Sequence, residues 1–197
     1  MRKIILQIVV LSAFMATTSL SAASFTYNTN SLVGIEGSYS SFDVENDATP
    51  PLREKIDFSG IGLKIGAETD NYRLFLSVRN SFIDGNYDYA YFYGGEVQYL
   101  MNFASFANFF IGVNGGYTNF RFVDSLNESR DVASTYFGGD LGFNVHLGSS
   151  VDLELGARIM KLSEATSIAT STPGSLNYKF DNISAGYASI IFKYSMD

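Results

Sequence analysis

The sequence of 197 residues lacks cysteine and tryptophan and contains only three prolines and one histidine. Without cysteine, a disulfide framework, a thiolate metal site and a cysteine nucleophile are excluded. Charged residues make up only 17% of the chain, and the formal net charge of −7 at pH 7 disfavours a nucleic-acid partner. Eighteen glycines, 17 phenylalanines and 13 tyrosines are present instead. A disordered chain is poor in aromatics, so this composition favours one sheet-rich domain whose surroundings are less polar than water.

The first 23 residues have the parts of a secretory signal peptide in their usual order. Two basic residues follow the first Met, residues 4–16 form an apolar run of 13, and a stretch of small residues ends at Ala23. We predict cleavage after Ala23, with Ala22 as the alternative, and a mature domain of residues 24–197. A membrane anchor is the competing interpretation, but 13 apolar residues are too few to span about 30 Å of hydrocarbon as a helix.

Apolar side chains recur at every second position along the rest of the chain, which is the period of a β-strand. Residues 97–120 lack charge, but their asparagines, glycines and strand period argue against a membrane-spanning helix. Seven of the predicted strands have about eight to ten residues and the last one is longer, which is about the length of a tilted transmembrane strand. They cover residues 33–40, 60–67, 72–79, 93–101, 109–118, 138–147, 151–160 and roughly 178–194. In the last of them the alternation slips between Ile183 and Ile190, so its faces stay unassigned.

The predicted connections alternate in length along the chain. Long or intermediate connections alternate with short turns, as in outer-membrane barrels, where loops lie outside the cell and turns lie in the periplasm. The longer ones cover residues 45–55, 83–88, 124–133 and 163–176, and the shorter ones residues 68–71, 102–107 and 148–150. The sequence therefore predicts an all-β protein, an eight-stranded antiparallel up-and-down transmembrane β-barrel. A periplasmic or secreted β-sandwich or a lipocalin-like barrel is the alternative, which the signal peptide, the loop lengths and tyrosines at strand ends disfavour.

The two faces of the predicted strands differ in charge. One face carries no charged side chain over seven strands, as contact with lipid requires. The other face holds four acids and four bases: Glu36, Lys64, Arg73, Arg79, Glu96, Asp140, Glu154 and Arg158. The lumen of an eight-stranded barrel is just wide enough to be filled by side chains. We predict that these residues form ion pairs that plug it, for example Glu96 with Arg79; a narrow polar channel gated by such a pair is the alternative.

Three segments resemble the small outer-membrane β-barrels of the OmpA/OmpX-like superfamily. They are LVGIEGSY at residues 32–39, the Gly-x-Gly-x-Lys-x-Gly pattern at residues 60–66, and IIFKY at residues 190–194. The resemblance implies a barrel in the bacterial outer membrane. It also implies that an aromatic at the end of the last strand is read by the barrel-assembly machinery; Tyr194 and Phe192 match this signal, although three residues follow Tyr194.

No local motif predicts an enzyme. His146 is the only histidine and is expected on the lumen face, so a lipid-modifying barrel with a His/Ser/acid set is a weak alternative. We predict a non-enzymatic outer-membrane protein without a cofactor, a monomer, with a structural or surface-loop-presenting role such as adhesion. Its expected partners are outer-membrane lipids, lipopolysaccharide and the assembly machinery, with a surface ligand at loops 45–55 and 163–176. The alternative function is a small passive, porin-like channel.

Overall fold

The computed structural model describes residues 29–46, 53–83, 87–123, 129–163, 178–180 and 182–195. The predicted signal peptide with Ala22 and Ala23, most of loop 45–55 and almost all of loop 163–176 lie outside these residues. No helix within the described residues is long and apolar enough to cross a membrane.

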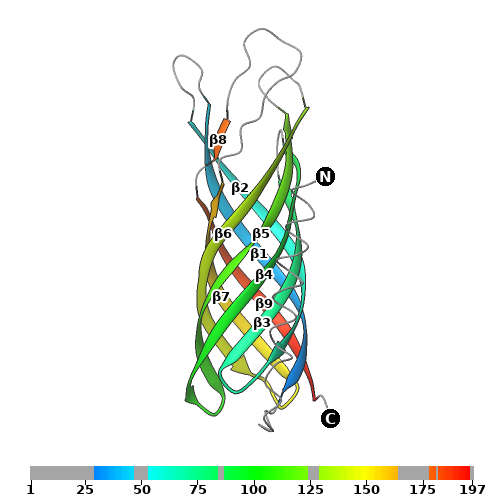
Figure 1. Cartoon of the computed structure of the whole chain (residues 1–197), viewed down its shortest axis with the longest axis vertical. Coiled ribbons are helices and arrows are strands. Elements are labelled where there is room, and N and C mark those ends of the chain that lie inside the picture. The colour runs from blue at the N-terminus through cyan, green and yellow to red at the C-terminus, as the bar shows by residue number, and fades with distance from the viewer. Residues whose placement is uncertain are drawn as a thin grey trace, which may run out of the picture.

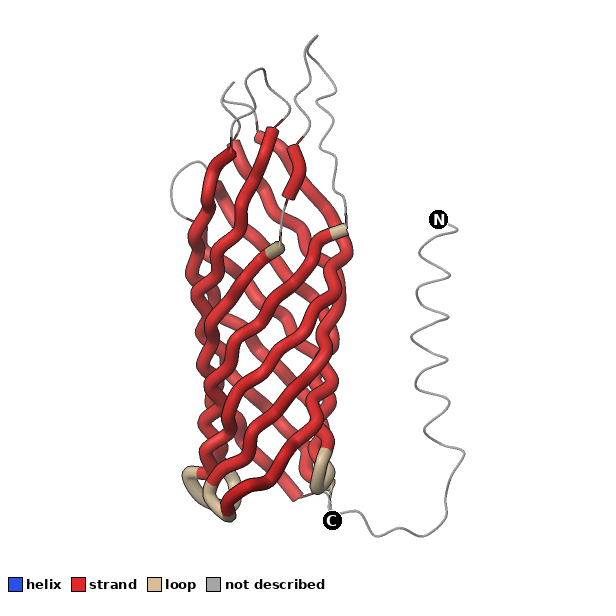
Figure 2. Tube along the Cα trace, turned by 90° about the vertical axis from the view of Figure 1, so that its left-hand side faces the viewer, coloured by secondary structure: helices blue, strands red, loops and turns tan. Residues whose placement is uncertain are grey.

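The described residues form a closed antiparallel β-barrel (Figures 1 and 2). From β1 (Asn30–Asn46) to β7 (Val151–Leu162), strands that follow one another in the chain pair with each other. The last strand, β9 (Ile183–Ser195), pairs with both β7 and β1, which closes the sheet. The short β8 pairs with β1 beyond the end of β9, so β8 and β9 share one position in the wall. The predicted eight-stranded barrel is therefore confirmed. The strands are β1 (Asn30–Asn46), β2 (Arg53–Glu68), β3 (Tyr72–Ile83), β4 (Tyr87–Ala104), β5 (Ala107–Val123), β6 (Ser129–His146), β7 (Val151–Leu162), β8 (Tyr178–Phe180) and β9 (Ile183–Ser195).

One end of the barrel carries the three short turns and both ends of the barrel wall. Asn30 pairs with Ser195 there, and two of the turns are closed by backbone hydrogen bonds, from Thr69 N to the Tyr72 oxygen at 2.8 Å and from Leu147 N to the Val151 oxygen at 2.9 Å. The other four connections leave from the opposite end (Figure 2). We call these the turn end and the loop end. The alternation of ends is the arrangement that the sequence predicted, but the lengths follow it only in part: the connection between β3 and β4 covers residues 84–86 and is no longer than the turns.

Several strands are longer than predicted. β2 begins at Arg53 rather than at residue 60, and β4 begins at Tyr87 rather than at residue 93. These extensions lie at the loop end, where outward positions such as Lys55 and Asp57 are polar. The apolar alternation fades there because those residues lie beyond the apolar exterior, while the ladder of strand hydrogen bonds continues.

The last strand has no irregularity in its pairing with β1. Ile183, Tyr187 and Ile191 point into the lumen and are buried, whereas Ile190 and Phe192 point outward. The slip in the sequence pattern therefore comes from apolar residues on both faces, because this strand crosses lumen layers that are themselves apolar.

Glycines on the lumen face make room for two large side chains. A Cβ atom at Gly156 would lie 2.5 Å from Cζ of Tyr187, and one at Gly94 would overlap the hydroxyl of Tyr136. The two tyrosine rings thus lie against bare backbone, which lets them pack across the narrow lumen.

Candidate functional site: the charged lumen

Large apolar side chains cover the outside of the barrel. They include Ile61, Leu63 and Ile65 on β2 and Leu74, Leu76 and Val78 on β3, all about half exposed. Tyrosines mark the edges of this apolar exterior, for example Tyr72, whose ring centroid lies 5.3 Å from that of Tyr99. An apolar band edged by aromatic residues is the exterior of a membrane-spanning barrel.

The lumen is filled in layers along the barrel axis. At the loop end is an aromatic layer of buried apolar side chains. Below it lies an ionic layer, then two small apolar clusters, and at the turn end a second charged group that we call the mouth cluster. The aromatic layer consists of Phe42, Val44, Ile56, Phe58, Ala90, Phe92, Phe120, Tyr136, Met160, Leu162, Phe180 and Ile183. The apolar clusters are Leu32 with Phe75 and Ile191, and Leu100 with Phe110 and Tyr187.

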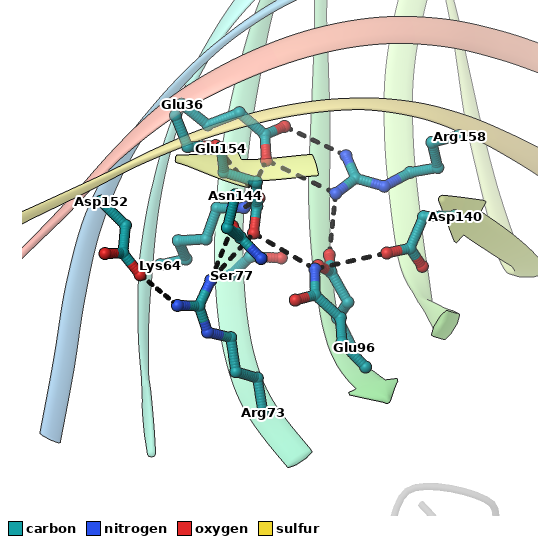
Figure 3. A network of polar contacts seen from close by, with 12 residues as sticks. Glu36, Lys64, Arg73, Ser77, Glu96, Asp140, Asn144, Asp152, Glu154 and Arg158 are labelled. Atoms are coloured by element: carbon teal, nitrogen blue, oxygen red, sulfur yellow. Dashed lines mark hydrogen bonds and ion pairs between the residues drawn. The ribbon is translucent and has the colours of Figure 1, made fainter. Parts of the chain in front are cut away.

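The ionic layer is centred on Arg158 of β7 (Figure 3). Its guanidinium donates to Glu36 at 3.0 and 3.4 Å and to Glu96 at 2.7 Å, so carboxylates from β1 and β4 meet on one cation. The ring of Tyr187 lies 4.3 Å from its Cζ atom. Arg158 is 2% exposed. A guanidinium so far from water is stable only because two carboxylates and an aromatic face surround it.

Lys64 of β2 is the second cation of the ionic layer. Its Nζ atom lies 2.6 Å from Glu154 and 3.2 Å from Glu36. The rings of Phe75 and Tyr187 lie 5.0 and 5.1 Å away. Glu36 is therefore shared by Lys64 and Arg158, which joins β1, β2 and β7 through the lumen.

Asp140 of β6 is held by amides. Asn114 donates to it at 3.2 Å and Gln98 at 3.4 Å, while Gln98 also donates to Glu96 at 2.6 Å. Arg158 is its partner in the register of β6 and β7, but the guanidinium contacts Glu36 and Glu96 instead. Within the described residues Asp140 thus has hydrogen bonds and no ion pair.

The mouth cluster surrounds Arg73 of β3, which is fully buried. Its guanidinium contacts Glu68 and Asp152 and donates to Asn144 at 2.7 Å. Asp152 also lies 3.0 Å from Lys193 and 2.7 Å from Nδ1 of His146. The cluster is therefore Glu68, Arg73, His146, Asp152 and Lys193, and it borders a polar hollow of about 300 Å³ at the turn end.

The structure brings all eight predicted lumen residues together inside the barrel, and none is more than 6% exposed. One predicted pair was wrong. Glu96 pairs with Arg158, and Arg79 lies 3.6 Å from Glu36. In the β3–β4 register Arg79 is opposite Phe92, four residues from Glu96, which is about 13 Å along the strand.

Three charged residues of the lumen were not among the predicted site residues: Glu68, Lys193 and Asp152, which is also the partner of His146. Asp152 has the strand parity of Glu154, and Glu68 has that of Lys64, so both could have been found. Lys193 could not, because the faces of its strand were not assigned.

The other predicted sites are placed only in part. Tyr194 and Phe192 lie on the outer face of β9 beside the turn end, and their role as an assembly signal stays a prediction. Within the described residues, no group of three or more His, Asp or Glu side chains could hold a metal ion.

At the loop end an exposed ion pair joins β5 and β6 beyond the apolar exterior. Arg121 donates to both oxygens of Asp131, at 2.7 and 2.9 Å, and lies 5.2 Å from the ring of Tyr89. The hydrogen bonds from Arg121 lower the pKa of the Asp131 carboxyl. The β5–β6 hairpin is thus tied together outside the membrane-spanning part.

No family model and no curated protein matches the sequence. The fold, however, is similar to those of solved bacterial barrels. Neisserial surface protein A has a TM-score of 0.60 at 12% identity, with 82% of this chain and 97% of that chain covered. Outer membrane protein OprG from Pseudomonas aeruginosa has a TM-score of 0.60 at 15% identity, covering 86% and 98%.

A third similar structure is outer membrane protein AlkL in lipid bilayers, with a TM-score of 0.53 at 15% identity, covering 90% of this chain and 96% of that chain. At these identities the likeness concerns the fold alone. The chain has the fold of the small bacterial outer-membrane β-barrels, as the resemblance in its sequence implied.

Proposed function

We propose that this chain is a non-enzymatic protein of the bacterial outer membrane whose lumen is closed and whose loop end presents surface loops for interaction. The outer-membrane location is supported by the apolar exterior with its tyrosine edges, by the signal-peptide pattern of residues 1–23, and by the fold shared with outer-membrane barrels.

The filled lumen is the observation that carries the proposal. A solute moving along the axis meets the aromatic layer, where the rings of Phe120 and Phe180 lie 4.7 Å apart, and then the ionic layer around Arg158. Opening a path would separate charges that are buried away from solvent, and breaking one such pair costs about 3–5 kcal/mol. A structural plug therefore suits these contacts better than a passage.

The strand extensions support a role at the cell surface. At the loop end Glu45 of β1 pairs with Arg53 on one side and with Lys179 on the other. The chain segments that lead into loops 45–55 and 163–176 thus start from three adjacent strands. Two loops that start from neighbouring strands can contribute to one contact surface, and loops on a rigid scaffold are common binding sites. We propose in addition that the barrel is a monomer that contacts lipopolysaccharide and that its loops bind a protein ligand.

Single-channel recording of the refolded protein in a planar bilayer tests the closed lumen. Refolding is checked first by the change in gel mobility on boiling, so that silence is not caused by unfolded protein. We expect no conductance steps from folded protein. Steady, ion-selective steps that change in Arg79→Ala or Glu96→Ala would contradict the proposal and favour the small passive channel.

The polar hollow at the turn end is the one observation that favours the channel. It is lined by Glu68, His146 and Lys193 and opens toward the periplasmic side. Such a hollow would be the vestibule of a pore. If the channel is correct, Lys193→Glu should change the ion selectivity of the recorded steps, whereas a closed barrel gives no steps in either form.

A further inference from the structure

The outer face of β5, β6 and β7 is hollowed at Gly139. In the strand register Gly139 lies beside Ile159, and Phe137 and Leu141 are its outward neighbours along β6. A Cβ atom at Gly139 would meet only the carbonyl oxygen of Gly112, at 3.4 Å. The missing side chain leaves a groove of about 470 Å³ that is open to the membrane side.

The groove has apolar walls. Phe137 and Ile159 are 61% exposed, and Leu141 is half exposed. These side chains stand up around Gly139 rather than covering it. Small-molecule sites have volumes of about 300–1,000 Å³, so the groove is large enough to hold part of a lipid molecule. Because its walls are apolar and the surrounding face contacts lipid, an acyl chain fits it chemically.

Lys161 places a positive charge at one end of the groove. It lies on the outer face of β7, next to Phe137 in the register and nearest the loop end. Other bases on the outer face have acidic neighbours: Lys55 lies 3.8 Å from Asp57, and Arg121 lies 2.7 Å from Asp131. Within the described residues Lys161 has no acidic group at ion-pair distance.

An exposed lysine beside an apolar surface extends its ammonium toward the polar headgroups while its methylenes cover the apolar part. An anionic headgroup at this level would meet Lys161 while its acyl chain runs toward Gly139. The loop end faces the outer leaflet in the proposed orientation, so the lipid comes from that leaflet.

We propose that the groove formed by Phe137, Gly139, Leu141, Ile159 and Lys161 binds one phosphorylated glycolipid of the outer leaflet, the lipid A part of lipopolysaccharide. One acyl chain lies over Gly139, and one phosphate contacts Lys161. This site rests on the proposed outer-membrane location, and it goes beyond general contact with lipid because it assigns one lipid molecule to one groove.

The test is native mass spectrometry of the refolded, delipidated full-length mature barrel in detergent, titrated with diphosphoryl lipid A. Gly139→Leu fills the groove with a side chain that has open space above it. Its matched control is Gly37→Leu, on the outer face of β1, where a Cβ atom has no neighbour within 4 Å. Lys161→Gln removes the charge, and Lys161→Arg keeps it.

We expect one lipid A molecule to bind wild type, Gly37→Leu and Lys161→Arg alike. Gly139→Leu should lose the bound lipid. Lys161→Gln should weaken binding about fivefold, the contribution of one basic residue at an anionic membrane surface. High salt should weaken wild type and leave Lys161→Gln unchanged, because screening acts on the charge contact.

Equal binding by Gly139→Leu and Gly37→Leu would overturn the site. Binding of phosphatidylglycerol as tightly as lipid A would overturn the glycolipid assignment, and a dimer that Gly139→Leu abolishes would assign the groove to a second copy of the chain. The gel-mobility change and the silent bilayers do not depend on this groove. If both persist without lipid A binding, the lipid site fails and the proposed function stands.

Discussion

In the middle of the lumen Arg158 contacts carboxylates from β1 and β4, whereas at the loop end Phe42, Phe120 and Phe180 fill the same cylinder with rings. The contacts of the ionic layer are directional and shared: Glu36 serves both Arg158 and Lys64. The contacts of the aromatic layer depend on shape and area. The ionic layer therefore fixes which strands face each other across the lumen. The aromatic layer excludes water from the loop end of the lumen.

This difference predicts unequal tolerance to the same kind of change. Loss of one member of the ionic layer leaves its partners charged in a site that is shielded from solvent, whereas loss of part of a ring leaves only a void. Unfolding by urea in detergent micelles measures this tolerance, and far-ultraviolet circular dichroism follows the unfolding because the chain has no tryptophan.

The largest effect is expected for Arg158→Leu. Two buried carboxylates, Glu36 and Glu96, lose their shared cation, and the free energy of unfolding should fall by about 3–5 kcal/mol. Adding Glu96→Gln to the variant should recover part of the loss, because one uncompensated charge is removed. A loss below about 1 kcal/mol, or no recovery in the double variant, would show that these charges are not paired in the folded barrel.

Gly156→Ala should disturb the contact between the two kinds of layer. Its new Cβ atom lies 2.5 Å from the Tyr187 ring, which packs on the Arg158 guanidinium. We expect a loss of about 1–3 kcal/mol from overpacking. The matched control is Gly186→Ala on the outer face, where a Cβ atom has no neighbour within 4 Å; it should leave stability nearly unchanged. If both variants have the same free energy of unfolding, the Tyr187 ring does not lie against Gly156.

Phe120→Leu should have a smaller effect than the leucine variant of the ionic layer. It removes part of a ring that packs edge-to-face on Phe42 and Phe180 and leaves no buried charge. We expect the free energy of unfolding to fall by about 1–2 kcal/mol. If this variant is as destabilising as Arg158→Leu, uncompensated buried charge is not what makes the ionic layer less tolerant than the aromatic layer.

The smallest effect is expected outside the lumen, at the exposed pair of Arg121 and Asp131. Asp131→Asn should cost about 0.2–1 kcal/mol at pH 7. Since Arg121 lowers the pKa of Asp131 in the folded state, this stabilisation is complete above the unfolded pKa of about 3.9 and is lost as pH falls through the folded pKa. Urea unfolding of both forms between pH 7 and pH 2 should therefore show their difference disappearing at the acid end. A difference independent of pH would contradict the pairing.

The fold was predictable because the wall of a membrane-spanning barrel needs an apolar outer face, and in a strand every second residue lies on that face. The pattern stopped short of the true strand ends at Arg53 and Tyr87, since outside the membrane a strand can carry polar residues on its outer face. In β9 the pattern also failed to separate the faces, because Tyr187 and Ile191 meet apolar lumen clusters while Ile190 and Phe192 face outward.

The membership of the lumen site was more predictable than its pairing. Strand parity alone assigns Glu36, Glu96 and Arg158 to one face. The contacts of Arg158 with Glu36 and Glu96 join residues separated by 122 and 62 positions in sequence. The strand register and the closure of the barrel bring these residues together in space. The predicted pair of Arg79 and Glu96, which lie on the consecutive strands β3 and β4, is wrong for this reason. Adjacency of two strands does not fix the level along the barrel axis at which two side chains meet.

The most direct test of the closed, ion-paired lumen is solid-state NMR of the protein in lipid bilayers, with nitrogen-labelled arginine and carbon-labelled glutamate. We predict strong magnetisation transfer between the Arg158 guanidinium nitrogen and the Glu96 carboxylate carbon, because the nitrogen and oxygen atoms of this pair lie 2.7 Å apart. We also predict that the guanidinium protons exchange slowly with water. Loss of that signal in Glu96→Gln would assign it. A guanidinium that exchanges rapidly with water and shows no carboxylate contact would mean that the lumen is open and hydrated.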